Sequence, residues 1–295
     1  MEILNPNLEI RNNIKIVNSN FPSVLEHAKI RILNLFRISY FALRISLISF
    51  FIAGCTTLNP ATGRNEFIMI STDDEVRMGQ AIHAQLLKEN HVSTDEKILE
   101  RVERVGRSLA AVSDRQDYEY HFFVIEKDEL NAFTVPGGNI YFYTGLLKLL
   151  DSDEEVAAVL AHEIGHCAAR HTVKKFQAAL GYNLIESIVF SQVEMGEGAR
   201  QIASMSTGTL MNIVFSAYGR RDELEADRLG VKYMHLAGYD LEGMIKTLKV
   251  LEKESEGKEI PSIVRTHPYV KDRIKAVEKE IETVQAKDKI STEAK

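Results

Sequence analysis

The sequence predicts a mainly helical α+β fold with a small β-sheet. Two of the predicted helices open with a capping box, a Ser or Thr followed three residues later by Glu. Two short aromatic and β-branched stretches, 118–126 and 139–145, are typical of strands. The 295-residue chain is 45% hydrophobic and 26% charged, so it can bury a substantial core in one or two domains.

Residues 1–54 are predicted to be a signal peptide with a long N-terminal region. Arg37 and Arg44 precede an apolar run of about nine residues, 45–53, which fits a signal-peptide core and falls short of the roughly 20 residues that span a bilayer. The run ends in IAGC, which resembles a bacterial lipoprotein signal, where the cysteine is lipidated and becomes the mature N-terminus. Cys55 is therefore the predicted lipidation site. The alternative is a buried cysteine at the end of an ordinary helix.

The segment after Cys55 is predicted to be a tether that leads into a helical domain. Residues 55–72 contain Asn-Pro and Thr-Gly turns and are expected to link the membrane to the domain. Thr72 and Glu75 form a capping box that opens a helix of about 18 residues. A second amphipathic helix is expected from Asp95 to about Val112, ahead of the two strands.

Ser152 and Glu155 form the second capping box. The helix that they open is expected to continue to about Leu180, because no Gly follows Gly165 and no Pro interrupts it. The uncharged run 202–218 is expected to be a buried helix rather than one that dips into a membrane. Three more helices are expected, then a frayed polar tail, so that the predicted domain covers 73–285: the helices span about 221–236, 240–256 and 270–286, and the tail spans 286–295.

Residues 162–166 read HEIGH, two histidines four apart with a glutamate after the first. On a helix, positions i and i+4 lie on one face, so His162 and His166 can present imidazole nitrogens to one cation. Glu163 is then placed to deprotonate a water molecule at the metal rather than to bind the metal. The alternative is a pair of histidines that only pack on a helix face.

A catalytic zinc needs three protein ligands and one open position. The long form HExxHxxGxxH is excluded, because Ala169 and Thr172 stand where that pattern has Gly and His. His171 lies about 140° around the helix from His166 and is expected to pack elsewhere. Cys167, about 100° from His166, is also expected to pack rather than bind metal. The third ligand must therefore be a carboxylate from a second helix.

The segment RRDELEADRLG, residues 220–230, can supply that carboxylate. Glu223 and Asp227 are four residues apart, so Glu223 is predicted to reach the metal while Asp227 accepts the distal N–H of a ligand histidine. Glu225 points about 160° away from Asp227 and is expected on a solvated face. An acidic helix with no such role would simply be surface.

HEIGH and ELEAD, together with NAFTVPGGNIYFYTGLL upstream and THPYVKDRI downstream, make the chain similar to the M48 family of zinc metallopeptidases from about residue 70 to 285. With Cys55, it resembles the periplasmic lipoprotein members of that family. The resemblance implies a gluzincin fold with a small β-sheet beside the HExxH helix. It implies one zinc ion per chain, bound by His162, His166 and Glu223, with Glu163 as the general base.

The stretch before the second strand is a candidate substrate-binding element. Asn131, Pro136, Gly138 and Asn139 lie where the chain breaks ahead of the strand at 139–145. The edge of that strand is predicted to pair with an extended peptide and to present its carbonyl to the metal. An ordinary hairpin loop would use the same residues.

His267, in the triplet THP, resembles a family histidine near the cleft. Two roles are open for it: donating to the oxyanion, or occupying the fourth zinc position as a latch. Arg220 matches a family arginine and is expected to pair with Asp227 or another buried carboxylate, whereas Arg221 is expected on the surface. A plain surface position is the alternative for His267 and for Arg220.

The sequence therefore predicts a lipid-anchored zinc endopeptidase that cuts unfolded or unassembled envelope proteins. Thr56, rather than Asp, after the lipidated cysteine implies the periplasmic face of a bacterial outer membrane. The net charge of −6, without a basic run beside aromatics, argues against nucleic acid as a partner. One alternative is a latched, chaperone-like assembly factor with little proteolysis. A structural metal protein is the other, although structural zinc more often has four Cys or His ligands.

Overall fold

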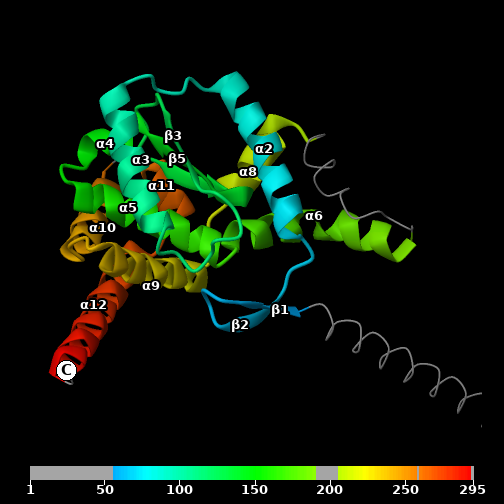
Figure 1. Ribbon diagram of the computed structural model, residues 1–295. Coiled ribbons are helices and arrows are strands. Elements are labelled where there is room, and N and C mark those ends of the chain that lie inside the picture. The colour runs from blue at the N-terminus through cyan, green and yellow to red at the C-terminus, as the bar shows by residue number, and fades with distance from the viewer. Residues whose placement is uncertain (1–55, 191–204, 258, 294–295) are drawn as a thin grey trace, which may run out of the picture. The chain divides into compact units, whose positions relative to one another are not determined.

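The computed structural model describes residues 56–190, 205–257 and 259–293 (Figure 1). The predicted signal peptide 1–54 and the lipidation site Cys55 lie outside the described residues. None of the helices in the described ranges is long and apolar enough to cross a membrane.

A three-stranded sheet contains β3 (His121–Ile125), β4 (Ala132–Val135) and β5 (Asn139–Tyr143) in the order β3-β5-β4. β3 runs parallel to β5, and β4 runs antiparallel to it. The 3₁₀ turn η1 (Pro136–Gly138) joins β4 to β5, with Gly137 and Gly138 at φ of 78° and 79°. β5 is therefore the central strand, and the expectation that its edge is free to pair with a peptide was wrong. β4, which was not predicted from the sequence, pairs along that edge.

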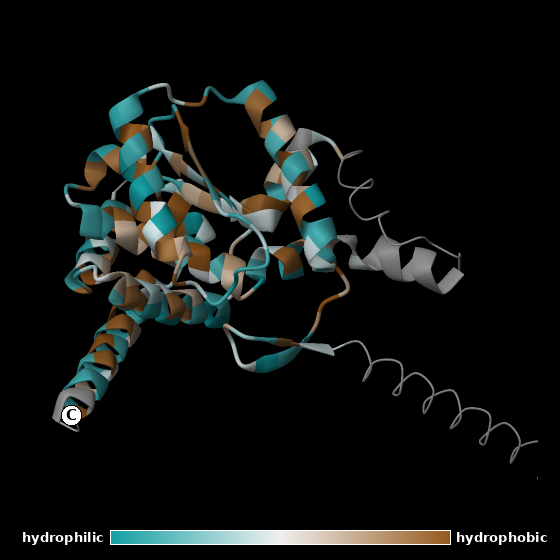
Figure 2. Cartoon of the chain, in the orientation of Figure 1, coloured by the Kyte–Doolittle hydropathy of each residue, from teal (hydrophilic) through white to brown (hydrophobic). Residues whose placement is uncertain are grey.

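One face of the sheet packs on α5 (Asp153–Ala168), the helix that carries the two histidines. Ser152 caps α5 by accepting a hydrogen bond from the Glu155 N–H at 3.3 Å, as its capping box predicted. α3 (Glu96–Ala110), α9 (Arg220–Ala237) and α10 (Glu242–Ser255) surround α5. Hydrophobic and hydrophilic residues alternate along α3 (Figure 2), and its apolar residues join the core. The core on this side includes Val105, Leu109, Val124, Ile140, Phe142, Leu160 and Ile164.

The other face packs on α2 (Thr72–Glu89), α6 (His171–Phe190) and α8 (Thr207–Val214). Tyr141 and Tyr143 of β5 point to this face, because successive side chains of a strand alternate. The side-chain cap of α2 is Ser71, which accepts from the Asp74 N–H at 3.1 Å, so the capping box predicted at Thr72 was placed one residue late. α8 is shorter than the helix expected in the run 202–218, and residues 202–204 are outside the described ranges.

The helix predicted to run to Leu180 is in fact two helices, α5 and α6. The break falls at Arg170, which has a φ of 56° in the left-handed region. Its guanidinium donates to the carbonyl of Ile70 at 2.7 Å and to Glu75 at 3.1 Å. These contacts stabilise a conformation that helical periodicity alone does not predict, and α6 therefore starts in a new direction at His171.

The predicted tether is wrong for residues 56–67, which form a β-hairpin of β1 (Thr56–Asn59) and β2 (Arg64–Phe67). The hairpin contacts two helices. Arg228 of α9 donates to the carbonyl of Ala61 at 3.3 Å, and Lys174 of α6 pairs with Glu66 at 2.8 Å.

The C-terminal part adds α11 (Ser262–Thr266) and α12 (Val270–Glu293), and α4 (Thr144–Leu149) follows β5 earlier in the chain. The tail expected to fray from 286 is helical as far as 293, because no Gly or Pro ends α12 there.

Candidate metal centre

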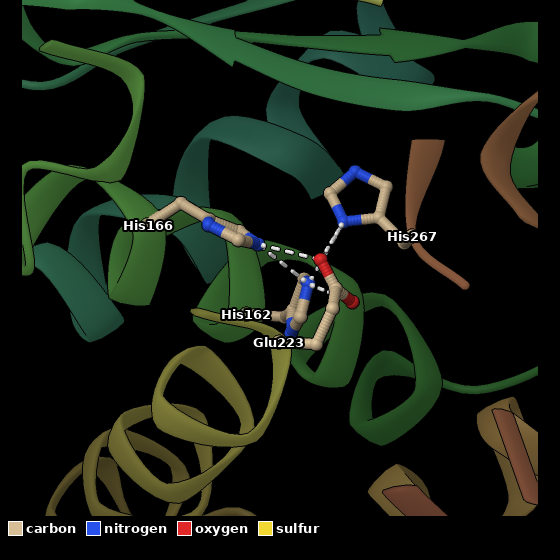
Figure 3. Close-up of side chains that lie close together, drawn as sticks. All are labelled: His162, His166, Glu223 and His267. Carbon is tan, nitrogen blue, oxygen red and sulfur yellow. Dashed lines mark hydrogen bonds and ion pairs between the residues drawn. The ribbon is translucent and has the colours of Figure 1, made fainter. Parts of the chain in front are cut away.

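Four buried side chains converge beside the sheet (Figure 3). α5 supplies His162 and His166, α9 supplies Glu223, and the connection from α11 to α12 supplies His267. Each offers one ligand atom, and these atoms all lie within 4.8 Å of one another. The Nε2 atoms of His162 and His166 are 3.0 Å apart, as expected for two histidines one turn apart.

Glu223 and His267 close the group from the far side. Glu223 Oε1 lies 3.4 Å from His166 Nε2, and Glu223 Oε2 lies 3.6 Å from His162 Nε2. The Nδ1 of His267 is 3.1 Å from Glu223 Oε1 and 3.1 Å from His162 Nε2. His267 is thus close enough to bind the same ion as the other three.

The absence of a side chain at Gly165 allows α5 and α9 to approach this closely. A Cβ on Gly165 would lie 2.7 Å from the carbonyl oxygen of Ala226, closer than carbon and oxygen tolerate without a shift. Gly165 is one residue from His166, and Ala226 is three from Glu223. The small residue of HEIGH therefore sets the distance between the two ligand-bearing helices.

On the His162 side, a carboxylate and a guanidinium hold the ligands in place. His162 Nδ1 is 2.8 Å from Asp227 Oδ1, so its Nε2 faces the site. Arg273 of α12 binds Asp227 through Nε at 2.7 Å and Nη2 at 2.8 Å, and its Nη1 lies 2.8 Å from Glu223 Oε2. The prediction that Arg220 pairs with Asp227 or another buried carboxylate was wrong. Arg220 is exposed and pairs with Asp272 at 3.2 Å.

The sequence does hold a signal for Arg273, since it lies six residues after His267 in the segment THPYVKDRI. Arg273 lies in the first turn of α12, beside the loop that carries His267. Its Nη1 also donates to the carbonyl of His267 at 3.3 Å.

On the His166 side, the break before α6 brings His171 back to the site. His171 Nδ1 is 2.9 Å from His166 Nδ1, and its Nε2 is 3.3 Å from Glu225 Oε2. The expectation that His171 packs elsewhere was wrong, because it assumed one continuous helix. The expectation of a solvated Glu225 was also wrong, because Arg64 of the hairpin covers it and binds it at 2.6 Å.

Tyr218 was also missed, because no motif marks it. Its ring stacks on His166 with 3.9 Å between centroids, and its hydroxyl lies 3.0 Å from Thr172 Oγ1. The ammonium group of Lys175, which is half-buried, lies 3.7 Å from the Tyr218 ring centroid. Burial lowers the pKa of Lys175 to about 8.

The electrostatics of the group suit a cation. Burial lowers the pKa of His166 well below its ordinary value, so the ring is neutral and the Nε2 lone pair is available. Burial raises the pKa of Glu223, but the charges of His267 and Arg273 outweigh it and hold that pKa well below the usual range. Burial likewise raises the pKa of Asp227, but neighbouring groups, above all the charge of Arg273, outweigh burial and lower this pKa below its ordinary value.

Glu163 lies beside this group and is almost completely buried. Among the described residues, neither of its carboxylate oxygens has a hydrogen-bond partner, and His267 Nε2 lies 3.5 Å from Oε1. Burying a carboxylate without a partner costs free energy unless a ligand or a water molecule interacts with it. Two imidazoles, one carboxylate and a free carboxylate next to them are the donor set of a catalytic zinc site, so the residues fit zinc.

Cys167 behaves as expected. Its thiol lies 2.8 Å from Thr134 Oγ1, and burial raises its pKa to about 12. The thiol is not among the four side chains that converge at the site.

Three of the predicted substrate-binding residues, Pro136, Gly138 and Asn139, lie in and next to the turn between β4 and β5, and Asn131 lies directly before β4. Asn131, Pro136, Gly138 and Asn139 are buried, and the Pro136 carbonyl faces Gly79 of α2. Asn139 also lines a groove of about 580 Å³ between α2 and β3, which none of the four candidate metal ligands lines. Their role in substrate binding stays a prediction, and the sheet edge on this side is β4.

An HExxH helix and a glutamate from a second helix, both packed beside a small sheet, define the class of HExxH metallopeptidases. The model of peptidase family M48 matches residues 96–281, and the chain belongs to this family. The mainly helical α+β fold agrees with that membership.

Characterised relatives fall in the same family. The chain is 27% identical to the beta-barrel assembly-enhancing protease of Escherichia coli over 73% of its own length and 45% of that protein. It is 28% identical to the mitochondrial metalloendopeptidase OMA1 of Schizosaccharomyces pombe, over 79% of this chain and 68% of that one. It is also 28% identical to metalloprotease LoiP of E. coli, over 60% and 70%. The chain thus spans less than half of the first of these relatives.

Proposed function

We propose that this protein is a zinc endopeptidase that hydrolyses peptide bonds in unfolded or unassembled polypeptides of a bacterial cell envelope. His162, His166 and Glu223 bind one zinc ion, and Glu163 is the general base. The observation that carries the proposal is the buried Glu163 carboxylate, which has no hydrogen-bond partner among the described residues and lies next to the four convergent ligand atoms.

When bound, the metal polarises a carbonyl and a water molecule as a Lewis acid. Glu163 accepts the proton of the attacking water and later delivers it to the leaving amine. Asp227 keeps the proton of His162 on Nδ1, which directs Nε2 into the site. Arg273 keeps Asp227 and Glu223 ionised by its two ion pairs.

For His267, the latch is the role that the geometry favours. An oxyanion donor would point at the substrate carbonyl, whereas His267 Nδ1 lies within 3.1 Å of both Glu223 and His162. We propose that His267 occupies the fourth ligand position until substrate displaces it. The same observation favours a second candidate function, a latched, chaperone-like assembly factor that binds polypeptides and rarely cuts them.

The envelope location is part of the proposal. The first relative has a name that refers to β-barrel assembly, and LoiP is also a bacterial metalloprotease. We propose that residues 1–54 are removed as a signal peptide, that Cys55 carries lipid, and that the domain acts on the periplasmic face of the outer membrane. If Cys55→Ala changes neither the mature mass nor the membrane association, this part of the proposal is wrong.

The test of the chemistry is cleavage of unfolded casein by the purified full-length chain, with bound metal measured in each variant. We expect the parent to cut, Glu163→Gln to hold metal and be inactive, and His267→Ala to cut faster. A loss of activity in His267→Ala would assign it to the oxyanion instead. Metal-loaded parent and Glu163→Gln that bind casein equally and leave it intact would refute the peptidase and favour the assembly factor.

A further inference from the structure

The two ligand histidines are held in different ways. His162 donates its Nδ1–H directly to a carboxylate, Asp227. With Nε2 of His166 facing the metal, its Nδ1–H donates to Nδ1 of His171 at 2.9 Å. His171 then carries its proton on Nε2 and donates it to Glu225 Oε2 at 3.3 Å. The hydrogen bonds that start at His166 thus also lead to a carboxylate, but through a second imidazole.

The last member of this chain of hydrogen bonds comes from the N-terminal hairpin. Arg64 of β2 donates from Nη2 to the same Glu225 oxygen at 2.6 Å. His171 and Glu225 are buried, whereas the Arg64 side chain is partly exposed. The hairpin is fixed to the domain beside this contact, because Glu66 pairs with Lys174 of α6 at 2.8 Å and the Ala61 carbonyl accepts from Arg228 of α9 at 3.3 Å.

We propose that His171, Glu225 and Arg64 are positioning residues for the ligand His166. Through Arg64, the hairpin 56–67 then helps to orient a ligand of the metal centre. This inference rests on the proposed function only in that the four-residue group binds zinc. The segment that follows the proposed lipid anchor would then set the affinity of the metal site through the contact between Arg64 and Glu225, which are 161 residues apart in the sequence.

The physical reason is the loss of order that follows when a link is removed. Without the Glu225 carboxylate, nothing keeps the proton of His171 on Nε2, and its Nδ1 no longer reliably accepts from His166. His166 is then free to adopt the tautomer that protonates Nε2, which cannot bind metal. Removal of outer-shell partners of this kind lowers metal affinity by roughly 10-fold to 100-fold.

The experiment compares Glu225→Gln and Arg64→Gln with a matched control, Asp222→Asn. Asp222 lies one turn earlier on the exposed side of α9, with its carboxylate 3.6 Å from His171 Nε2, beyond hydrogen-bond distance. The full-length chain is purified in detergent, and the zinc dissociation constant is measured by competition with a chelator. The visible spectrum of the cobalt-substituted protein reports the ligand geometry.

We expect the zinc dissociation constant to rise about 10-fold or more in Glu225→Gln and in Arg64→Gln, with a shifted cobalt spectrum. Asp222→Asn and the conservative Arg64→Lys stay within about threefold of the parent, because they leave a cation on Glu225. Urea unfolding of each metal-free protein shows that the Gln variants remain folded.

Zinc affinity and cobalt spectra that match the parent in both Gln variants would overturn the inference, whatever happens to stability. An equal loss of zinc affinity in Asp222→Asn would also overturn it, since the effect would then not be specific to Glu225. A parent that binds zinc, shows these differences and leaves casein intact refutes the proposed peptidase and keeps the positioning role. A parent that binds no zinc refutes both.

Discussion

Replacing Arg273 with Met is expected to destabilise the protein strongly. Arg273 is buried, and its guanidinium makes a two-point contact with Asp227 and a third contact with Glu223. The substitution keeps much of the side-chain volume but leaves two buried carboxylates without their cation. Removing one partner of a buried ion pair costs about 3–5 kcal/mol.

The control is Arg220→Met, which removes an arginine from the surface. Arg220 pairs with Asp272 while both side chains are about half exposed, so its loss costs less than about 1 kcal/mol. For a domain of this size, the loss at Arg273 corresponds to a fall in melting temperature of roughly 6–20 °C.

Urea unfolding in the presence of a chelator measures both variants without the charge of a bound metal. The double variant Arg273→Met with Asp227→Asn should recover part of the loss, because it removes one uncompensated carboxylate. A loss below about 1 kcal/mol in Arg273→Met, or no recovery in the double variant, would refute the view that Arg273 neutralises this buried acidic pair.

Three further predictions concern α5. Gly165→Ala should weaken zinc binding and lower the melting temperature, because its Cβ would meet the carbonyl of Ala226 and push α9 away; chelator competition and thermal unfolding measure this. Cys167 should react with a thiol reagent only after unfolding, because its thiol is buried with a pKa of about 12; the absorbance of the released chromophore measures this in a chain without Cys55. Ser152→Ala should cost about 1 kcal/mol of stability through loss of the helix cap and leave zinc affinity unchanged, as urea unfolding and competition show.

Each of these has a result that contradicts it. Gly181→Ala is the control for Gly165→Ala, since a Cβ there meets nothing within 4 Å, and equal effects in the two variants would refute the close-contact argument. Rapid labelling of Cys167 in the native protein would contradict its burial. A change in zinc affinity in Ser152→Ala would mean that the helix start and the metal site are not independent.

Local patterns predicted the parts of the fold that local chemistry determines. The helix start at Ser152 and the strands near 121–125 and 139–143 follow from capping and from β-branched and aromatic runs. The break at Arg170 was not predictable in this way. Its left-handed backbone is stabilised by contacts with Ile70 and Glu75, about 100 residues earlier in the chain.

The same distinction applies to the site. The spacing of His162 and His166, and of Glu223 and Asp227, predicts which side chains share a helix face, and the structure places them together. The errors at Glu225, His171 and Arg220 arose where the answer depends on another segment. Periodicity gives the direction of a side chain around its own helix, but not which segment packs against that face.

The positions of these errors show how the centre is built. α5 provides two imidazoles, but each imidazole is oriented by groups from elsewhere: His162 by Asp227 and the arginine of α12, His166 by His171 beyond a helix break. An HExxH helix alone therefore supplies nitrogen atoms without fixing their tautomers or directions. Because α9 and α12, which are distant in sequence, and the helix break before His171 must all form before both Nε2 atoms face one point, metal affinity in this protein depends on the tertiary fold as well as on the motif.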